Sequence, residues 1–498
     1  MEPLLLLGGA ALAAPWWAHH RARAVDRPLA ASDDMSVTGL WARHVAAPSH
    51  ALPGASLTRL GAFEHGETYR VQLVPGRQSL AMAHSALPLI CTGLRRPLDE
   101  LVIERDPDTA DPSLLRMQVL TTSPIKDTVL FDGPRFAEGR IMLGPYADGL
   151  GDATYRLYTR NSMWGGFLLG SIGSGKTRIS ESVALSARAM APVMPTSVVY
   201  VDGQDGASSS VLWKHSALRG GSGDSGRVLE VIEAIMHTRQ QYNVAHELAG
   251  FTPGADRVGI LIIVDECHVP FGKHAERWAH IARTGRKVGV AVLAADQYSD
   301  LKVFGNMEPL RSSLLAGNGL VLRTTSRMAG HLLPGLNLDP YELPELPGYG
   351  YTIAAAGSDA RTAPFRARYL PDRDDKADDP SIAVPSVQEW FDRIPAVQLD
   401  AEAQRAMDRA LERLDRPARK TLSPSVPAVA DDEELGGTMA DRILALMSSH
   451  DGPMRLAEIL AALPSETVVS TVQKAIKGLV DRGTVLRVEH GVYELPPG

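Results

Sequence analysis

The sequence has only two cysteines, Cys91 and Cys267, among its 498 residues. They lie far apart and form neither a disulfide framework nor a metal-binding spacing, so we expect a protein of a reducing compartment. Aromatic residues are also scarce, at 6%, whereas hydrophobic residues reach 44% and charged residues 22%, the ordinary balance of a globular protein. A chain of this length predicts about two to four domains with a large core.

A strong charge of either sign is missing as well. The net charge is −7, and two acidic segments, 371–380 and 431–434, carry all of it. The remainder of the chain is near neutral. It therefore permits a local basic surface for nucleic acid without demonstrating one.

Long hydrophobic runs are absent apart from residues 4–18, an apolar run of 15 residues. A helix that spans a bilayer needs about 17–25 residues, so this run is short. The tryptophans within it and the arginines after it are typical of an interfacial belt with a cytoplasmic flank, and no Lys or Arg precedes it as in a signal peptide. We expect residues 1–33 to be a membrane anchor that holds a cytoplasmic body at the inner face of the membrane. The alternative is a packed or disordered apolar tail.

A glycine-rich turn between an apolar strand and a helix is the clearest functional signal. Residues 170–177 fit the phosphate-binding pattern G-x-x-x-x-G-K-[ST]. Glycines let backbone N–H groups converge on phosphate oxygens, and the helix after the turn presents its positive N-terminus to them. We expect Lys176 to reach the β- and γ-phosphates of ATP and the Thr177 hydroxyl to hold Mg²⁺. The predicted ATP-binding residues are Gly170, Ser171, Ile172, Gly173, Ser174, Gly175, Lys176 and Thr177.

Two later apolar strands end in polar side chains. Residues 260–264 lead into Asp265 and Glu266, and residues 288–295 lead into Asp296 and Gln297. Because ligands bind at the carboxyl ends of strands in open α/β sheets, we expect Asp265 to hold Mg²⁺ and Glu266 to polarise the attacking water. Gln297 is expected to contact the γ-phosphate or that water. An acidic residue after a strand also serves as a helix N-cap, and an amide there can belong to an ordinary loop.

Hydrophobic patterning divides the chain into regions. Residues 34–148 predict a small α+β domain for docking or oligomerisation. In residues 150–370 apolar strands alternate with helices, which predicts an α/β fold with a doubly wound parallel sheet. Residues 371–437 are rich in Asp and Pro and predict a linker with a helical segment between 385 and 415.

Residues 438–498 predict three amphipathic helices followed by a hairpin, the arrangement of a winged helix-turn-helix. Its third helix would offer Gln473, Lys474 and Lys477 to a DNA groove. Winged helices also serve as protein-docking modules, so DNA and a protein both stay open as partners of this region.

The motifs in this order resemble the FtsK/SpoIIIE group of DNA-pumping ATPases, and within it the actinobacterial plasmid-transfer branch of TraSA and TraB type. The resemblance covers about residues 150–370 and rests on GSIGSGKT (170–177), LIIVDE (261–266), GRKVGVAVLAADQ (285–297) and LRSSLLAGNGLVLRTTSR (310–327). It implies a P-loop, RecA-like fold, a homohexameric ring that threads double-stranded DNA, and an arginine finger donated by a neighbouring subunit. Arg286 and Arg323 are the catalytic candidates for that finger, and Arg283 and Arg327 stay open beside them.

Two positions depart from the group's pattern. The chromosome-segregating members typically show Asp-Pro-Lys where this chain has Asp202-Gly203-Gln204, and Ala-Thr-Gln where it has Ala295-Asp296-Gln297. These departures fit a mobile-element branch better than chromosome segregation.

The sequence therefore predicts an ATP-dependent translocase of double-stranded DNA, moving plasmid or integrative-element DNA between cells in conjugation, with ATP and Mg²⁺ as cofactors. One alternative is a nucleotide-controlled, non-motor DNA-binding scaffold. Another is a protein-secretion ATPase of the same superfamily.

Overall fold

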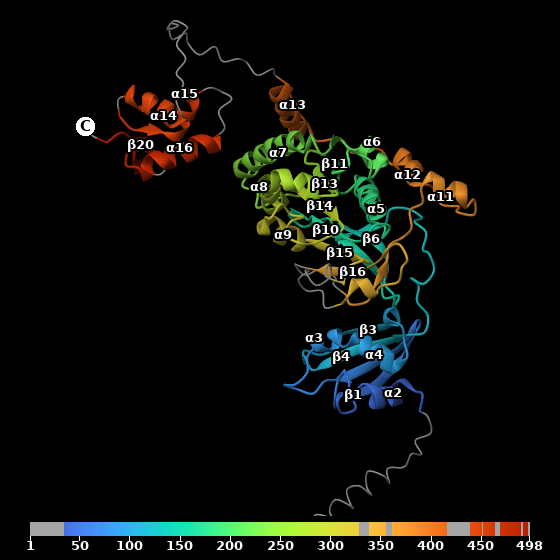
Figure 1. The fold of residues 1–498 in the computed structure, drawn as a ribbon. Coiled ribbons are helices and arrows are strands. Elements are labelled where there is room, and N and C mark those ends of the chain that lie inside the picture. The colour runs from blue at the N-terminus through green and yellow to red at the C-terminus, as the bar shows by residue number, and fades with distance from the viewer. Residues whose placement is uncertain are drawn as a thin grey trace, which may run out of the picture. The chain divides into compact units, whose positions relative to one another are not determined.

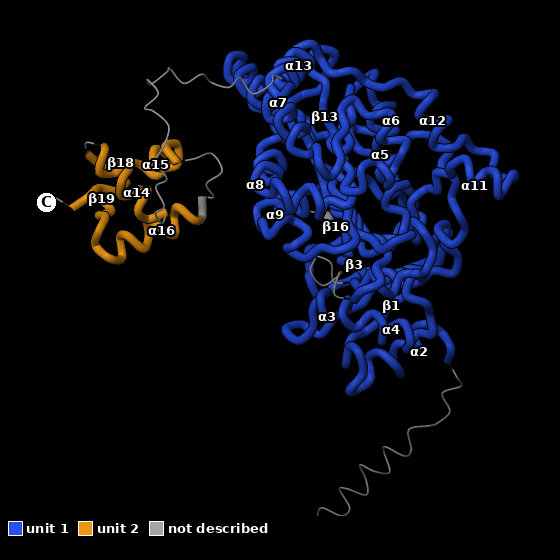
Figure 2. The backbone as a smooth tube through the Cα atoms, turned by 45° about the horizontal axis from the view of Figure 1, so that its top comes forward, with its two compact units in different colours: residues 1–417 blue, residues 418–498 orange. Residues whose placement is uncertain are grey.

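A computed structural model describes residues 34–327, 338–354, 361–415, 439–450, 452–463, 469–489 and 492–496. The chain divides into two compact units, residues 1–417 and 418–498, which Figure 2 distinguishes by colour. The apolar run at residues 4–18 and the end of the expected linker region, 416–437, lie outside the described residues. Within the described ranges, no helix combines the length and the apolar character that crossing a membrane requires.

The first unit begins with an antiparallel sheet of order β1-β2-β4-β3, formed by β1 (Ser56–Phe63), β2 (Gly66–Gln72), β3 (Leu101–Arg105) and β4 (Leu114–Leu120). Helices α2 (Val37–His44), α3 (Leu80–Ser85) and α4 (Leu87–Leu94) contribute to its core, and the short helix η1 (Leu98–Glu100) leads into β3. The expected α+β mixture of elements is thus observed. That residues 34–148 act as a separate domain stays a prediction.

Short strands connect this sheet to the rest of the unit. They are β5 (Phe136–Ala137), β6 (Arg140–Pro145) and β7 (Asp152–Arg156) in one antiparallel sheet, and β8 (Tyr158–Thr159) with β9 (Ser162–Met163) in another. Residues of β6 and β7 join the core beneath the main sheet, so the connection is packed and not a free linker.

An eight-stranded sheet forms the centre of the first unit (Figure 1), in the order β12-β11-β13-β14-β10-β15-β16-β17. The first six strands are parallel, β16 pairs antiparallel with β15, and β17 pairs antiparallel with β16. Their bounds are Leu218–Gly220 for β12, Thr196–Asp202 for β11, Gly259–Asp265 for β13, Val290–Asp296 for β14, Gly166–Leu169 for β10, Asn318–Leu322 for β15, Tyr349–Ala354 for β16 and Phe365–Arg366 for β17.

Helices cover both faces of this sheet, which explains why its central strands are buried at every position and largely apolar. One face packs against α5 (Lys176–Ala189), α6 (Ser210–His215) and α12 (Val387–Arg393). The other face packs against α7 (Ser225–Ala245), α8 (His268–Thr284), α9 (Glu308–Leu315) and α13 (Ala401–Asp415). Alternate residues of β13 belong to the two cores, Leu261 and Ile263 to one and Ile260, Ile262 and Val264 to the other. The prediction of a doubly wound parallel sheet is confirmed.

Residues 371–415, the first part of the expected linker region, contain the helical segment that was predicted between 385 and 415. They form α11 (Arg373–Asp378), α12 and α13, and the last two pack on the sheet. Helix α13 buries a stripe of small residues, Ala403, Ala406 and Ala410, against α7. A buried ion pair between Arg239 and Asp400, at 2.7 Å, fixes its start. Only α11 was not expected from the Asp-rich composition, since an aspartate also caps a helix, as Asp372 does here.

The second unit contains α14 (Met439–Ser448), α15 (Leu456–Ala462) and α16 (Val469–Asp481). A three-stranded sheet of order β18-β20-β19 completes it, formed by β18 (Met454–Arg455), β19 (Leu486–Glu489) and β20 (Val492–Glu494). Its core joins residues of all three helices, among them Ile443, Ile459 and Ile476. Three helices and a β19–β20 pair follow the expected order, and the assignment as a winged helix stays a prediction.

Candidate nucleotide-binding site

The glycine-rich loop lies between β10 and α5, at the carboxyl edge of the sheet. Gly173 and Gly175 have φ values of 76° and 101°, in the left-handed region that a residue with a Cβ rarely adopts. Gly170 has no room for a Cβ, which would lie 2.4 Å from the Ser174 hydroxyl oxygen. That hydroxyl donates to the carbonyl of Ser171 at 2.8 Å and closes the turn. The predicted phosphate-binding loop therefore has the backbone conformation that the glycine spacing requires.

Lys176, the first residue of α5, folds back over this loop. It is 8% exposed, and its Nζ donates to the carbonyl oxygens of Gly170 at 2.8 Å and Ser171 at 3.2 Å. Burial lowers the pKa of Lys176, while the charges of Glu266 and Asp265 oppose that shift. The ammonium group is thus held at the loop by carbonyl oxygens that phosphate oxygens could replace. Thr177 comes next, at the second position of α5, and is half-buried.

Three neighbouring parallel strands, β11, β13 and β14, each end in a buried aspartate at the same edge: Asp202, Asp265 and Asp296. Asp202 lies directly opposite Asp265 in the β11–β13 register. Its carboxylate accepts hydrogen bonds from the backbone N–H groups of Gln204, Gly206 and Ser208 and from the Ser208 hydroxyl. Asp202 therefore orders the loop after β11.

Asp265 differs from its neighbours because one of its oxygens lacks a donor. Oδ1 accepts a hydrogen bond from the backbone N–H of Glu266 at 3.0 Å, and none of the described residues donates to the buried Oδ2. Burial raises the pKa of Asp265 to about 7, and the charges of Asp202 and Glu266 add to that effect. A buried carboxylate oxygen without a donor fits a cation ligand, so Asp265 and Thr177 suit the Mg²⁺ expected with ATP.

Glu266 projects its carboxylate from a strained backbone, with φ of 45°. Its side chain is 12% exposed. Gln297 Nε2 donates to Oε1 at 3.2 Å, so the two catalytic residues expected from separate strands do meet. The structure thus brings Lys176, Asp265, Glu266 and Gln297 to one edge of the sheet, because β10 adjoins β14 and β14 adjoins β13.

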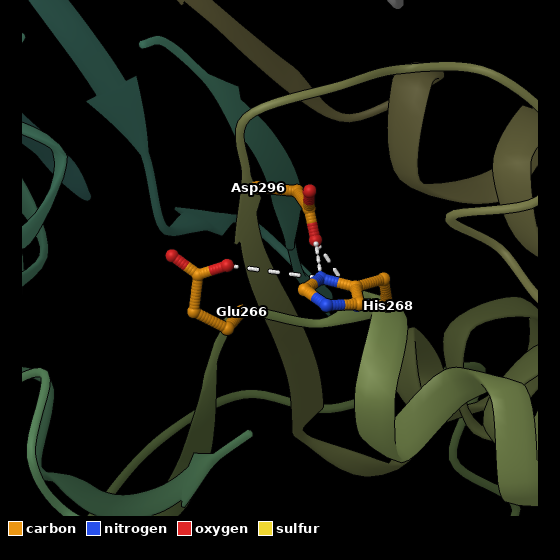
Figure 3. A group of neighbouring side chains, drawn as sticks. All are labelled: Glu266, His268 and Asp296. Atoms are coloured by element: carbon orange, nitrogen blue, oxygen red, sulfur yellow. Dashed lines mark hydrogen bonds and ion pairs between the residues drawn. The ribbon is translucent and has the colours of Figure 1, made fainter. Parts of the chain in front are cut away.

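His268 and Asp296 complete this group, and sequence reasoning gave neither a site role. Figure 3 shows the imidazole between the two carboxylates: Nδ1 lies 2.9 Å from Asp296 Oδ2 and 3.7 Å from Glu266 Oε2. These three side chains have the composition of a metal site. Asp296 Oδ2, however, already accepts hydrogen bonds from the His268 backbone N–H and from Nδ1. We therefore interpret His268 and Asp296 as a hydrogen-bonded pair that lies beside Glu266. The signal in the sequence was a histidine two residues after Glu266 and an aspartate directly before Gln297.

The arginine candidates lie at two different places. The backbone carbonyl of Arg323 accepts hydrogen bonds from the N–H of Ser171 at 3.0 Å and from its hydroxyl at 3.1 Å. The Arg323 guanidinium turns away from the loop, donating to the carbonyl of Leu343 and pairing with Glu345. Arg327 likewise pairs with a glutamate, Glu342.

Arg286 lies at the opposite end of the sheet. It belongs to the short helix η2 (Gly285–Val288), which precedes β14, and its guanidinium stacks 3.9 Å from the ring centre of Trp164. Together with Arg283 it lines a hollow of about 250 Å³ at the amino ends of β10 and β14. Strand β14 therefore separates Arg286 from the carboxyl edge of its own chain, and its expected role as a finger toward a neighbouring subunit stays a prediction.

The expected DNA-contacting residues lie in the second unit. Gln473, Lys474 and Lys477 are exposed on α16, whereas Val472 and Ile476 of the same helix are buried. Helix α16 thus has an apolar inner face and a polar, basic outer face.

Neither a protein-family model nor a curated protein sequence matches the chain. Among solved structures, the pCW3 conjugation coupling protein TcpA, in a monomer form with ATPgS, is similar at 14% identity, over 67% of this chain and 94% of that one, with a TM-score of 0.44. The cytoplasmic domain of the type VII secretion ATPase EccC from Thermomonospora curvata is 21% identical over 55% of this chain and 33% of that one, with a TM-score of 0.43.

The second and third ATPases of EssC from Geobacillus thermodenitrificans are also similar. They are 15% identical over 58% of this chain and 53% of that one, with a TM-score of 0.41. Because all three TM-scores lie below 0.5, the function of this chain is inferred from the geometry of its own site.

Proposed function

We propose that the protein is an ATPase that moves double-stranded DNA, acting on plasmid or integrative-element DNA during conjugation. The observation that supports it most is the buried edge where Lys176 on its glycine loop faces Asp265 and Glu266. A cation-binding carboxylate and a phosphate-binding lysine at one edge are what a metal-bound triphosphate needs.

Each residue of the site has a separate role in ATP hydrolysis. The loop N–H groups and Lys176 hold the β- and γ-phosphates, and Thr177 and Asp265 would hold Mg²⁺. The metal would neutralise charge on the phosphate oxygens. Glu266 accepts the proton of the water that attacks the γ-phosphorus as the bond to the β-phosphate oxygen breaks. Gln297, bonded to Glu266, orients that water.

Transport needs further parts that we assign as proposals. The exposed Gln473, Lys474 and Lys477 of α16 would contact DNA. A homohexameric ring would let Arg286, or Arg323, act on the nucleotide of a neighbouring subunit. Residues 1–33 would hold the ring at the inner face of the membrane. Contacts to the phosphate backbone need no base readout, which suits a motor that moves along any sequence.

ATP hydrolysis measured with and without double-stranded DNA tests the proposal. We expect stimulation by DNA. The variant Glu266→Gln should keep ATP binding and lose turnover by about 100-fold or more, because the amide cannot accept the proton. DNA-stimulated hydrolysis retained in Glu266→Gln would refute the role of that residue. A flat, low rate in the wild type would favour a non-motor scaffold, and stimulation by a protein substrate in place of DNA would favour secretion.

A further inference from the structure

The carboxylate of Glu266 is held from both sides. Its backbone is strained, and Gly203 approaches so closely that a Cβ there would lie 2.5 Å from the Glu266 carbonyl oxygen. Gln297 Nε2 donates to Oε1 at 3.2 Å, and His268 Nδ1 lies 3.7 Å from Oε2. These two neighbours flank the two carboxylate oxygens of Glu266.

Asp296 anchors both neighbours. Its Oδ1 accepts a hydrogen bond from the Gln297 backbone N–H at 2.8 Å. Its Oδ2 accepts one from the His268 backbone N–H at 3.0 Å and one from His268 Nδ1 at 2.9 Å. Because Asp296 is 1% exposed, water competes little for these bonds. Since a carboxylate accepts, Nδ1 of His268 carries the proton.

We infer that His268 is a positioning residue for ATP hydrolysis, which fixes the carboxylate of Glu266 from the Asp296 side. The inference rests on the proposed ATPase function. The imidazole is tied to Asp296 at Nδ1, and that same N–H faces Oε2 of Glu266 (Figure 3). Gln297 therefore donates to one carboxylate oxygen of Glu266, and His268, whose Nδ1–H donates to Asp296, lies beside the other oxygen.

A merely structural role would look different. The side chain of His268 is 48% exposed, so its removal takes little from the core. The backbone N–H of His268, the first residue of α8, would still donate to Asp296 after the imidazole is gone. The start of the helix thus keeps its acceptor, and stability and nucleotide binding should change little.

The test compares three substitutions at one position. His268→Ala removes the imidazole. His268→Asn places an amide nitrogen near the position of Nδ1, whereas His268→Gln places one near Nε2. His280→Ala, an exposed histidine on the same helix, is the matched control. For each variant, kcat, the KM for ATP and the Tm are measured with the full chain, Mg²⁺ and double-stranded DNA.

We expect His268→Ala to lower kcat about tenfold, because the carboxylate of Glu266 loses the neighbour that holds it from the Asp296 side, with KM and Tm unchanged. His268→Asn should restore most of kcat, and His268→Gln should not. In an Asp296→Asn background, His268→Ala should lower kcat little further, because the carboxylate that holds His268 is already gone.

The inference is overturned if His268→Ala keeps the wild-type kcat, if KM and Tm change together with kcat, or if Asn and Gln behave alike. A further tenfold loss in the Asp296→Asn background also overturns it. These results leave the proposed function standing when the wild type hydrolyses ATP. A wild type that binds ATP without turnover overturns both.

Discussion

Replacing Asp265 by asparagine should stabilise the nucleotide-free protein, although it removes a proposed metal ligand. The residue is 2% exposed, and burial, with the charges of Asp202 and Glu266, raises its pKa from 3.8 to about 7. At neutral pH the folded protein thus holds a carboxylate whose charge is poorly compensated. Asparagine keeps the shape of the side chain without that charge.

The size of the effect depends on pH, and its sign follows from linkage. Because the folded-state pKa lies above 3.8, the carboxyl group costs stability once the unfolded chain releases its proton. At about 1.4 kcal/mol per pKa unit, the cost is near zero below pH 3.8, about 1.5 kcal/mol at pH 5 and about 4 kcal/mol at pH 8. The advantage of Asp265→Asn should therefore grow by about 2.5 kcal/mol between pH 5 and pH 8. Any constant penalty of the amide cancels in this difference.

The difference in unfolding free energy between Asp265→Asn and the wild type is measured by urea unfolding, followed by tryptophan fluorescence, with EDTA present and nucleotide absent. All seven tryptophans precede residue 418, so the signal reports the first unit alone. Asp256→Asn, at an exposed position, is the control. A stability difference between Asp265→Asn and wild type that stays constant from pH 5 to pH 8 would refute the reasoning.

Three further predictions concern other parts of the chain. Lys176→Ala should weaken ATP binding about 10- to 100-fold, measured by calorimetry, because phosphate oxygens lose a charged donor; the exposed Lys302→Ala should not. Asp400→Ala should lower the unfolding free energy by about 3–5 kcal/mol, since Arg239, with a 3% exposed side chain, would lose its partner; Asp415→Ala, which breaks an exposed pair with Arg227, should leave urea unfolding unchanged. The double variant Lys474→Ala, Lys477→Ala should weaken DNA binding and flatten the slope of log K against log salt by about 2, while ATP hydrolysis without DNA stays at the wild-type rate. Equal DNA affinity and slope in that variant would remove α16 from the DNA contact.

The sheet and its functional edge could be predicted because fully buried parallel strands have a simple signature. Five apolar residues before Asp265 leave no face for water, so the strand is interior and its end is an edge. The glycine spacing then places Lys176 at that edge. The local sequence was sufficient to predict this site, because each of these residues follows within a few positions of the strand that places it.

The position of Arg286 was harder to predict because a motif combines residues that a strand separates in space. Arg286 and Gln297 lie in one sequence motif, but the seven residues of β14 lie between them. At about 3.3 Å per residue, such a strand sets its two ends roughly 20 Å apart. Within one chain, Arg286 and Gln297 therefore do not share a site, and a role for Arg286 toward the nucleotide of a neighbouring subunit stays a prediction.

The role of His268 was missed for the opposite reason, since its partner is remote in sequence and close in space. Asp296 was noted only as a departure from the Ala-Thr-Gln pattern. A threonine could accept from the backbone N–H of His268, but its single oxygen could not also bind Nδ1 and the Gln297 N–H as two carboxylate oxygens do. Asp296, at the end of β14, thus holds His268, at the start of α8, although the two are 28 residues apart in sequence. A variant with Asp296→Thr should therefore lose most of what His268→Ala loses in kcat, and a wild-type kcat in that variant would show that the pairing is incidental.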